Sequence, residues 1–226
     1  AYGGPRQDPG EHWEAIEEHG FKAMAPCDIM DEHEEMDLPV QNGFHLDKDI
    51  VGKNFANYDS VLVLSHFKGH AMAGLGGALK NISIGIASTQ GKAYIHTAGV
   101  TTDAAELWSK LPPQDHFLES MADACQAIIA YKGAENMVYI NVANRLSVDC
   151  DCSANPAEPE MADLGIFASL DPVAVDQACY DAVLNSPDPG KKALIERMES
   201  KHGIHTVEAA AQLGLGNREY EIVSLD

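Results

Sequence analysis

The stretch Ser60-Val61-Leu62-Val63-Leu64-Ser65 (SVLVLS) is a short run of β-branched and leucine side chains. Such a run is typical of a strand that is buried on both faces of a sheet. Further strand candidates are FHL (44–46), DIVG (49–52), KAYIH (92–96), MVYINVA (137–143), DLGIFAS (163–169) and EYEIVSL (219–225). Helical patterns separate several of these runs. The sequence therefore predicts an α/β fold, with a mainly parallel or mixed sheet and helices on both faces.

Helix starts are well marked. Asp8 as N-cap, Pro9 and Glu11 form a capping-box pattern, and Asp171-Pro172 repeats the aspartate–proline start. Other helices are expected after PPQD (112–115), from 188 to about 203, and over VEAAAQLG (207–214). The acidic stretch DIMDEHEEMDLP (28–39) is poorly periodic, so we expect a surface excursion there.

Length and composition favour one globular domain over residues 1–226. No stretch approaches the run of apolar residues that a membrane span needs, and the first residues lack a basic region followed by an apolar one. We therefore expect a cytoplasmic protein with no membrane partner. Five cysteines in a chain of 226 residues argue for reduced thiols rather than a disulfide framework.

The charge is strongly negative and unevenly distributed. A formal net charge of −20 disfavours binding to nucleic acid or to anionic membranes. Residues 1–59 contain fourteen acidic and four basic residues, whereas residues 60–102 contain no Asp or Glu, although roughly six or seven would be expected there. The acid-free segment contains three lysines and three histidines: Lys68, Lys80, Lys92, His66, His70 and His96. A buried core would also lack acids, but buried lysines need a partner.

The first part of this segment with ligand chemistry is His66-Phe67-Lys68-Gly69-His70, directly after SVLVLS. Residues that emerge from strand ends line the ligand crevice of open α/β sheets. In an extended chain His66, Lys68 and His70 share one face, and in a helix the two histidines still do. Two hydrogen-bonded histidines without a ligand are the alternative interpretation.

A second motif with ligand chemistry lies outside this segment, at Asp149-Cys150-Asp151-Cys152, after the MVYINVA strand. An extended Cys-x-Cys points both sulfurs the same way, which suits paired thiolate ligands better than a disulfide. His66, His70, Cys150 and Cys152 together would suit zinc or a similar transition metal. A thiol redox pair formed by the two cysteines is a further hypothesis.

A glycine-rich element follows at 74–81 (GLGGALKN). It matches neither the dinucleotide-binding fingerprint nor the Walker loop. Its backbone amides, with Lys80, could still cradle a carboxylate or phosphate. Alternatively, Gly74 and Gly77 only permit close helix packing. The sequence has no nucleophile elbow, which disfavours a serine hydrolase.

These motifs resemble the domain of unknown function 362 family, found in bacteria and archaea. The resemblance rests on SHFKGHAMAGLGGALKNISIGIASTQGK, on VDCDC followed by LGIFASLDPVAVDQA, on LGLGNREYEI, and on YGGPR and the helix ending in HGF. Many members carry a ferredoxin-like insertion with iron–sulfur clusters. Between His96 and Val138 this chain has only Cys125, so no iron–sulfur cluster is expected. YGGPR lies mid-domain in the family, which predicts that amino-terminal elements are missing.

The resemblance extends to fourteen positions: His66, Lys68, His70, Gly74, Gly76, Gly77, Lys80, Asn81, Lys92, His96, Cys150, Cys152, Asp171 and Asp176. We interpret Asp171 and Asp176 as helix cap and first-turn charge.

Our leading hypothesis is an enzyme-like domain that binds a transition metal and an anionic small molecule. The anion is expected to contact Arg6, Lys68, Gly74, Gly76, Gly77, Lys80, Asn81 and Lys92. His96 or Lys68 would transfer protons. The alternative is a non-catalytic module that binds an anion or docks a redox partner. The sequence leaves the reaction and the oligomeric state open.

Overall fold

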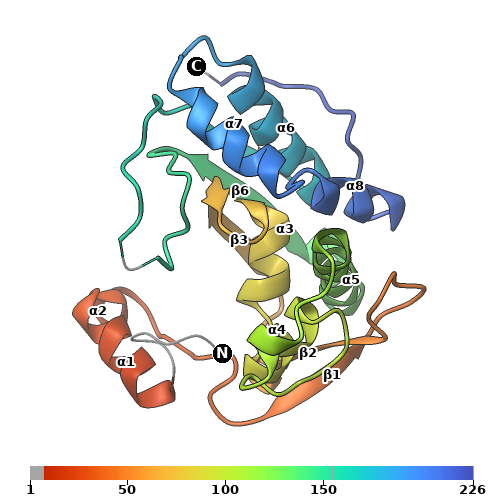
Figure 1. Cartoon of the computed structure of the whole chain (residues 1–226). Helices are drawn as coiled ribbons and strands as arrows, with labels where there is room; N and C mark the ends of the chain where they lie inside the picture. Colours follow the sequence, from red (N-terminus) through yellow and green to blue (C-terminus); the bar gives the residue numbers. More distant parts are fainter. Residues whose placement is uncertain (1–7, 154, 226) are drawn as a thin grey trace.

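The computed structural model describes residues 8–153 and 155–225, and its centre is a three-stranded sheet (Figure 1). The strands are β3 (Val61–His66), β6 (Met137–Ala143) and β7 (Gly165–Ser169), in the order β3-β6-β7. β3 runs parallel to β6, and β7 runs antiparallel to it. The α/β fold with a mixed sheet is thus confirmed, whereas the single domain expected over residues 1–226 stays a prediction.

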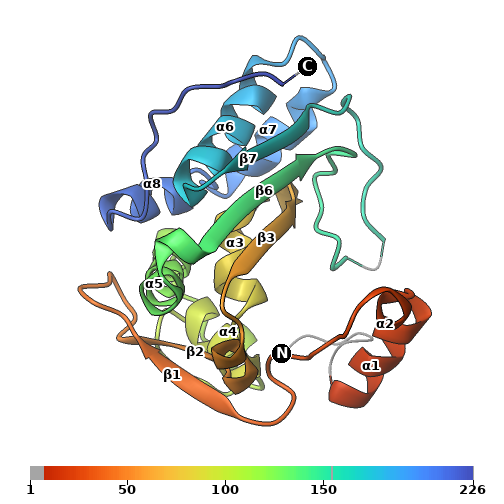
Figure 2. The same cartoon turned by 180° about the vertical axis from the view of Figure 1, so that it is seen from behind.

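Helices cover one face of this sheet. α3 (Ala78–Lys80) and α6 (Pro172–Asn185) pack against the side on which Val63, Tyr139 and Asn141 are buried. On the opposite side Leu62, Leu64 and Ile166 are 61–71% exposed, and no described helix lies over them (Figure 2). The expectation of helices on both faces is therefore wrong for the described residues. Because a short apolar run does not reveal whether its second face is covered, the sequence could not decide this point.

The remaining long helices pack beside the sheet. They are α5 (Gln114–Lys132), α7 (Lys191–Ser200) and α8 (His205–Gln212). Asp171 caps α6 by accepting hydrogen bonds from the backbone of Val173 and Ala174, as the aspartate–proline pattern predicts. Asp8 likewise caps α1 (Pro9–Glu18) through Glu11, and α2 (Phe21–Met24) follows. Within the described residues, none of the helices combines the length and the apolar character that crossing a bilayer requires.

Two antiparallel hairpins complete the strands. β1 (Glu35–Pro39) pairs with β2 (Lys48–Gly52), and β4 (Lys68–His70) pairs with β5 (Gly74–Gly76). The short helical elements are η1 (Lys53–Asn57), η2 (Asn81–Gly85), η3 (Leu107–Ser109) and η4 (Ala134–Asn136). β1 lies in the stretch that we expected to be only a surface excursion.

Three predicted strands are wrong. FHL (44–46) lies between β1 and β2 and forms no strand, because its three amides donate to the carboxylate of Asp123 instead of to a neighbouring strand. KAYIH belongs to the helix α4 (Thr89–His96), because the Ser88 side chain caps this helix by accepting from the amide of Gly91, 3.1 Å away. Five residues are too few to distinguish a period of 2 from one of 3.6. EYEIVSL forms no strand: Ile222 and Val223 are exposed, and no strand among residues 8–153 and 155–225 pairs with them.

Candidate functional site

The site is formed where the loop after β6 crosses the β4 strand. The Phe67 amide donates to the carbonyl of Val142 (3.0 Å), and the Gly69 amide donates to the carbonyl of Ser147 (2.8 Å). A Cβ at position 69 would overlap the carbonyl of Val148. The absence of a side chain at Gly69 therefore lets the two chain segments lie in contact, and the cysteines follow directly on the loop.

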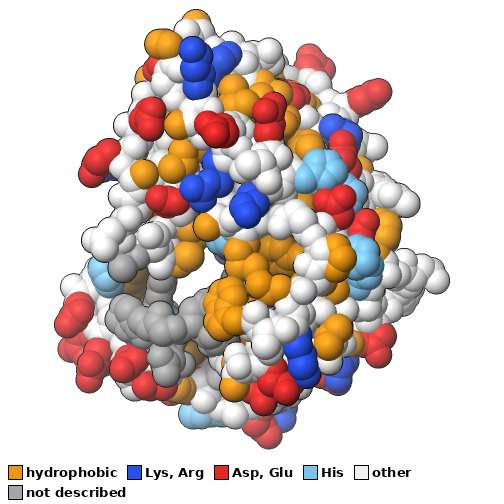
Figure 3. All heavy atoms as spheres, viewed as in Figure 1, with side chains coloured by type: hydrophobic (Ala, Val, Ile, Leu, Met, Phe, Trp, Pro, Cys, Tyr) orange, Lys and Arg blue, Asp and Glu red, His pale blue; other side chains and the backbone are white. Residues whose placement is uncertain are grey.

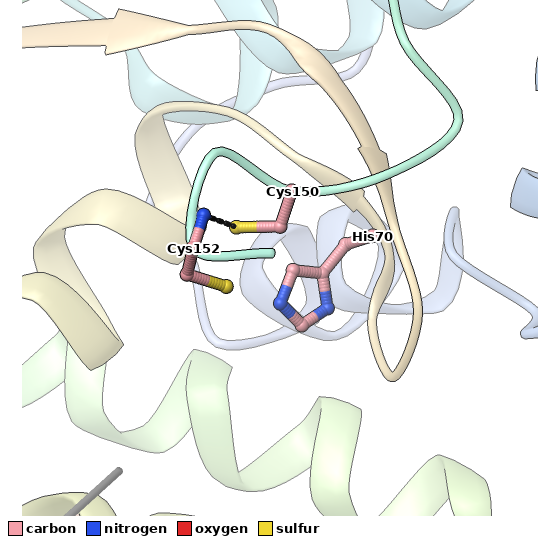
Figure 4. A group of neighbouring side chains, drawn as sticks. All are labelled: His70, Cys150 and Cys152. Carbon is pink, nitrogen blue, oxygen red and sulfur yellow. Dashed lines mark hydrogen bonds between the residues drawn. The ribbon is translucent and has the colours of Figure 1, made fainter. Parts of the chain in front are cut away.

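Three predicted metal ligands come together here. A ring nitrogen of His70 and the sulfurs of Cys150 and Cys152 all lie within 4.8 Å of one another. Figure 4 shows both sulfurs and one ring nitrogen directed toward the same space. Both thiols are free, and the Cys150 sulfur accepts a hydrogen bond from the Cys152 amide at 3.4 Å. We call this group the His70–Cys150–Cys152 cluster.

The backbone fixes the ring of His70. Its Nδ1 accepts hydrogen bonds from the amides of Met72 (3.1 Å) and Ala73 (2.9 Å), so the other nitrogen, Nε2, faces the thiols (Figure 4). Burial lowers the pKa of His70 to about 2, and the charges of Lys80 and Lys68 contribute to this shift. The ring is therefore neutral, and because Nδ1 is an acceptor, its proton lies on Nε2. A metal ion bound at Nε2 would have to displace that proton.

Two lysines lie beside the cluster. A Cβ at Gly76 would lie 3.4 Å from Cδ of Lys80 and 3.6 Å from Nζ of Lys68, so both side chains extend over this glycine. Burial lowers the pKa of Lys80, and the neighbouring Cys150 opposes the shift. Burial raises the pKa of Cys152, as does Cys150, while Lys80 and Lys68 act in the opposite direction. Burial thus favours the neutral amine of Lys80 and the neutral thiol of Cys152, and the attraction between ammonium and thiolate only opposes this effect.

The aspartates of the DCDC motif supply the counter-ions. Asp149 forms an ion pair with Arg197 of α7 at 3.4 Å, and Asp151 pairs with Lys68 at 3.1 Å. Sequence reasoning missed Arg197, whose charge also lowers the pKa of His70. No local pattern distinguishes this arginine from other charges on an exposed helix.

His66 lies outside the cluster. Its Nδ1 donates to Asp151 at 2.9 Å, and its Nε2 donates to the carbonyl of Asn144 at 2.7 Å. Both nitrogens thus face oxygen partners, and His66 does not join the group formed by His70, Cys150 and Cys152. The structure thus brings together three of the four predicted ligands.

The amides at the start of α3 bind an internal carboxylate. Ala78 and Leu79 donate to Asp176 at 2.7 and 3.0 Å, and a Cβ at Gly77 would overlap the same carboxylate. Burial raises the pKa of Asp176 to about 6, against the effect of its hydrogen bonds from Asn141, Leu79 and Ala78. These two amides are therefore occupied by the protein itself. A Cβ at Gly74 would come within 3.0 Å of Gly203 and Met198, which fits the packing interpretation.

Of the other predicted residues, His96 is buried, whereas Lys92 and Asn81 are half-buried. His96 is 3% exposed, donates from Nδ1 to the carbonyl of Lys92 (2.7 Å) and stacks on Phe117. Burial lowers its pKa to about 4. Lys92 donates to the carbonyl of Ala87 (2.5 Å), and the Asn81 side chain donates to Leu64 and Ser65. Arg6 lies outside the described residues.

A hollow of about 360 Å³ opens at the carboxyl ends of β3 and β6. His66, Asn144, Ser147 and Asp151 line it, together with the loop segment 156–159. This is the place where open α/β sheets bind ligands. Asp151 lines the hollow and also forms an ion pair with Lys68, which lies beside the cluster.

A comparison with known protein families identifies the family of this chain. The model of a domain of unknown function, DUF362, matches residues 3–181, a range that contains the whole cluster. The chain belongs to the DUF362 family. No curated protein and no solved structure is detectably similar to it. What this DUF362 chain binds is therefore indicated by the side chains of the site itself.

Proposed function

We propose that this DUF362 chain binds a transition metal ion through His70, Cys150 and Cys152 and an anionic small molecule beside it. The observation that carries the proposal is the approach of one ring nitrogen and two sulfurs to within 4.8 Å. These ligands come from segments about eighty residues apart, and Gly69 allows their contact. Two of the three ligands are held by backbone hydrogen bonds, which favours a preformed site.

The ligand chemistry favours a borderline or soft divalent ion. Two thiolates and one imidazole suit Zn²⁺ and Co²⁺ in tetrahedral geometry. Three protein ligands leave a fourth position for water or for an exogenous ligand, as in catalytic rather than structural zinc sites. Such an ion would polarise a bound oxygen.

The lysines support an anion as the exogenous ligand. Two thiolates balance the charge of a divalent ion. Their negative charge is then no longer available to balance the ammonium groups of Lys80 and Lys68. Within the described part of the chain Lys80 has no carboxylate partner, whereas Lys68 shares Asp151 with His66. A carboxylate or phosphate at the open position would satisfy Lys80. The roles of Lys68 and His96 in proton transfer stay predictions.

A metal-free anion site is the second candidate, and the tautomer of His70 favours it. With Nδ1 accepting two amide hydrogen bonds, Nε2–H is a donor directed at the site. Together with Lys80 and Lys68 it would offer three donors to an anion. This candidate requires no displacement of the imidazole proton.

Metal analysis and Co²⁺ titration of protein prepared under reducing, anaerobic conditions test the first candidate. We expect one ion per chain at this site, with ultraviolet thiolate-to-cobalt charge transfer that Cys150→Ser/Cys152→Ser abolishes. Cys27→Ser, a partly exposed cysteine outside the cluster, is the matched control. Binding should release protons and tighten as pH rises, because thiols and the Nε2 proton must be displaced.

Absence of thiolate charge transfer in the unaltered protein overturns the metal proposal. The anion is tested separately by thermal shift with phosphate and carboxylates at matched ionic strength. Lys80→Met should abolish the stabilisation, and Lys110→Met, which only removes an exposed pair with Glu106, should retain it. Stabilisation by anions without any thiolate–metal signal would favour the second candidate.

A further inference from the structure

A second group of metal-ligating side chains lies away from the cysteines, where α8 meets the start of α5. It contains four histidines and two carboxylates: His45, Asp115, His116, Glu119, His202 and His205. Figure 3 shows histidine and acidic side chains gathered over this part of the surface. No ligand role is predicted for these residues from the sequence, because they come from three separate segments of the chain.

Glu119 is the centre of the group. Its Oε2 accepts from Nε2 of His45 at 2.5 Å, and its Oε1 accepts from Nε2 of His205 at 3.1 Å. The ring of His116 lies 4.4 Å from that of His45, at an interplanar angle of 30°. Ligand atoms of His45, His116 and Glu119 all lie within 4.8 Å of one another. One carboxylate thus faces three imidazoles.

The arrangement is rigidly supported. His116 and Glu119 are three residues apart on α5 and therefore neighbours on its surface. The loop that carries His45 is held by Asp123, a fully buried residue of the same helix. Its carboxylate accepts from the amides of Phe44, His45 and Leu46 at 2.8, 2.8 and 2.9 Å. His45 is thereby fixed against α5 without any ligand.

Partial burial of two candidate ligands, His45 and Glu119, distinguishes the group from scattered surface histidines, although the third, His116, is exposed. The side chains of His45, Glu119 and His205 are only 19–21% exposed. Hydrogen bonds from His45 and His205 lower the pKa of Glu119 despite its partial burial, so its carboxylate is ionised. Two imidazoles and one carboxylate are ligands that suit Zn²⁺, Cu²⁺ and Ni²⁺.

We propose that His45, His116 and Glu119 bind a divalent transition metal ion, with His205 donating to the second oxygen of Glu119. The ion replaces the proton that His45 now shares with Glu119. His205 orients the carboxylate, as the outer partners of metal ligands do. Asp115 and His202, which pair at 2.8 Å, flank His205, whose ring stacks on that of His202. This site contains no thiolate and does not depend on the cysteine cluster.

The test uses the full chain with the substitutions Cys150→Ser/Cys152→Ser, so that any binding at the cluster is removed. Calorimetry with Zn²⁺ and electron paramagnetic resonance with Cu²⁺ should show one bound ion with nitrogen ligands. His45→Ala/His116→Ala should abolish this binding, and His205→Ala should weaken it by about 10- to 100-fold. His33→Ala is the matched control, since His33 is an exposed histidine 3.7 Å from a single carboxylate, Glu32.

Equal affinity in the His33→Ala and His45→Ala/His116→Ala variants would overturn the proposal, as would no binding by the Cys150→Ser/Cys152→Ser protein. Glu119→Gln keeps the size of the side chain and serves if the double histidine variant does not fold; undiminished binding by it would also count against the site. Because the readout excludes thiolate signals, this result is independent of the cobalt titration at the cysteine cluster.

Discussion

Four of the five cysteines fall into two pairs according to their surroundings. Cys125 and Cys179 are buried, and burial raises the pKa of both thiols. Cys125 donates to the carbonyl of Leu79, and Cys179 accepts from the side chain of Asn141. Cys150 and Cys152 instead lie beside ammonium groups and the His70 ring. Burial also raises the pKa of Cys152, but Lys80 and Lys68 oppose that shift, whereas no cation is among the causes acting on Cys125 or Cys179.

A buried carboxyl at Asp49 makes stability depend on pH. Asp49 is 0% exposed, and burial raises its pKa to about 7, although the Ile50 amide and Lys92 oppose the shift. In the unfolded chain the pKa is about 3.9. The folded state therefore binds more protons between these values, and the stabilising contribution is lost as pH rises from about 4 to about 7.

Asp49→Asn should remove this dependence. Relative to the variant, the unaltered protein should lose about 2–3 kcal/mol of unfolding free energy between pH 5 and pH 8. Urea denaturation at both pH values measures the difference. Asp59→Asn, at an exposed aspartate before β3, is the control and should follow the unaltered protein. A constant difference between protein and variant over this range would contradict the raised pKa.

At the scale of elements, the contact between β4 and the cysteine loop decides the site. His66 and His70 share a face in a continuous strand, yet the structure places them on two strands, β3 and β4. Phe67, which separates these strands, is fully buried and bonded to Val142. The period of two does not continue through this break, so His70 reaches the cysteines and His66 reaches Asp151.

Gly69→Ala should separate β4 from the loop that carries Cys150 and Cys152. Since the added methyl group overlaps the Val148 carbonyl, we expect a loss of about 2 kcal/mol in unfolding free energy. Co²⁺ affinity at the cluster should fall as well. Gly76→Ala, in the paired strand β5, meets only ordinary contacts of 3.4 Å or more and should cost under about 1 kcal/mol. Equal losses in the two variants would show that the loop contact is not specific. Urea denaturation and cobalt titration provide the two measurements.

At the scale of the whole molecule, acidic and cationic regions are separated by folding. The formal charge is −20, yet Lys68, Lys80 and Arg197 all act on His70. The acids that approach this group come from the cysteine loop itself, as Asp149 and Asp151. An anionic ligand would therefore be attracted to a small cationic region within a repelling field.

The open sheet face is the other global feature, and it should contribute little to stability. Leu62 and Leu64 are 62% and 61% exposed, whereas Val63 between them is 4% exposed. Leu62→Thr/Leu64→Thr should change the unfolding free energy by less than about 1 kcal/mol. Val63→Ala should cost about 2 kcal/mol. Urea denaturation compares them, and a large loss in the double variant would mean that another surface covers this face in solution.

Several helices and strands could be predicted from short stretches of sequence, because interactions between residues close together in the chain decide them. Aspartate–proline starts fix α1 and α6, short continuous apolar runs fix β3 and β6, and Cys-x-Cys spacing directs two sulfurs together. KAYIH shows the limit, since capping by Ser88 rather than its own composition makes it helical.

The sequence by itself determined the α/β class, the family and three of the residues that meet at the cluster. Only the tertiary structure decided that Asp176 occupies the amides of the glycine loop, that Arg197 joins the site and that His45 reaches Glu119. These contacts join residues between 48 and 98 positions apart. Their partners are chosen by packing over such separations, which no short-range period or spacing encodes.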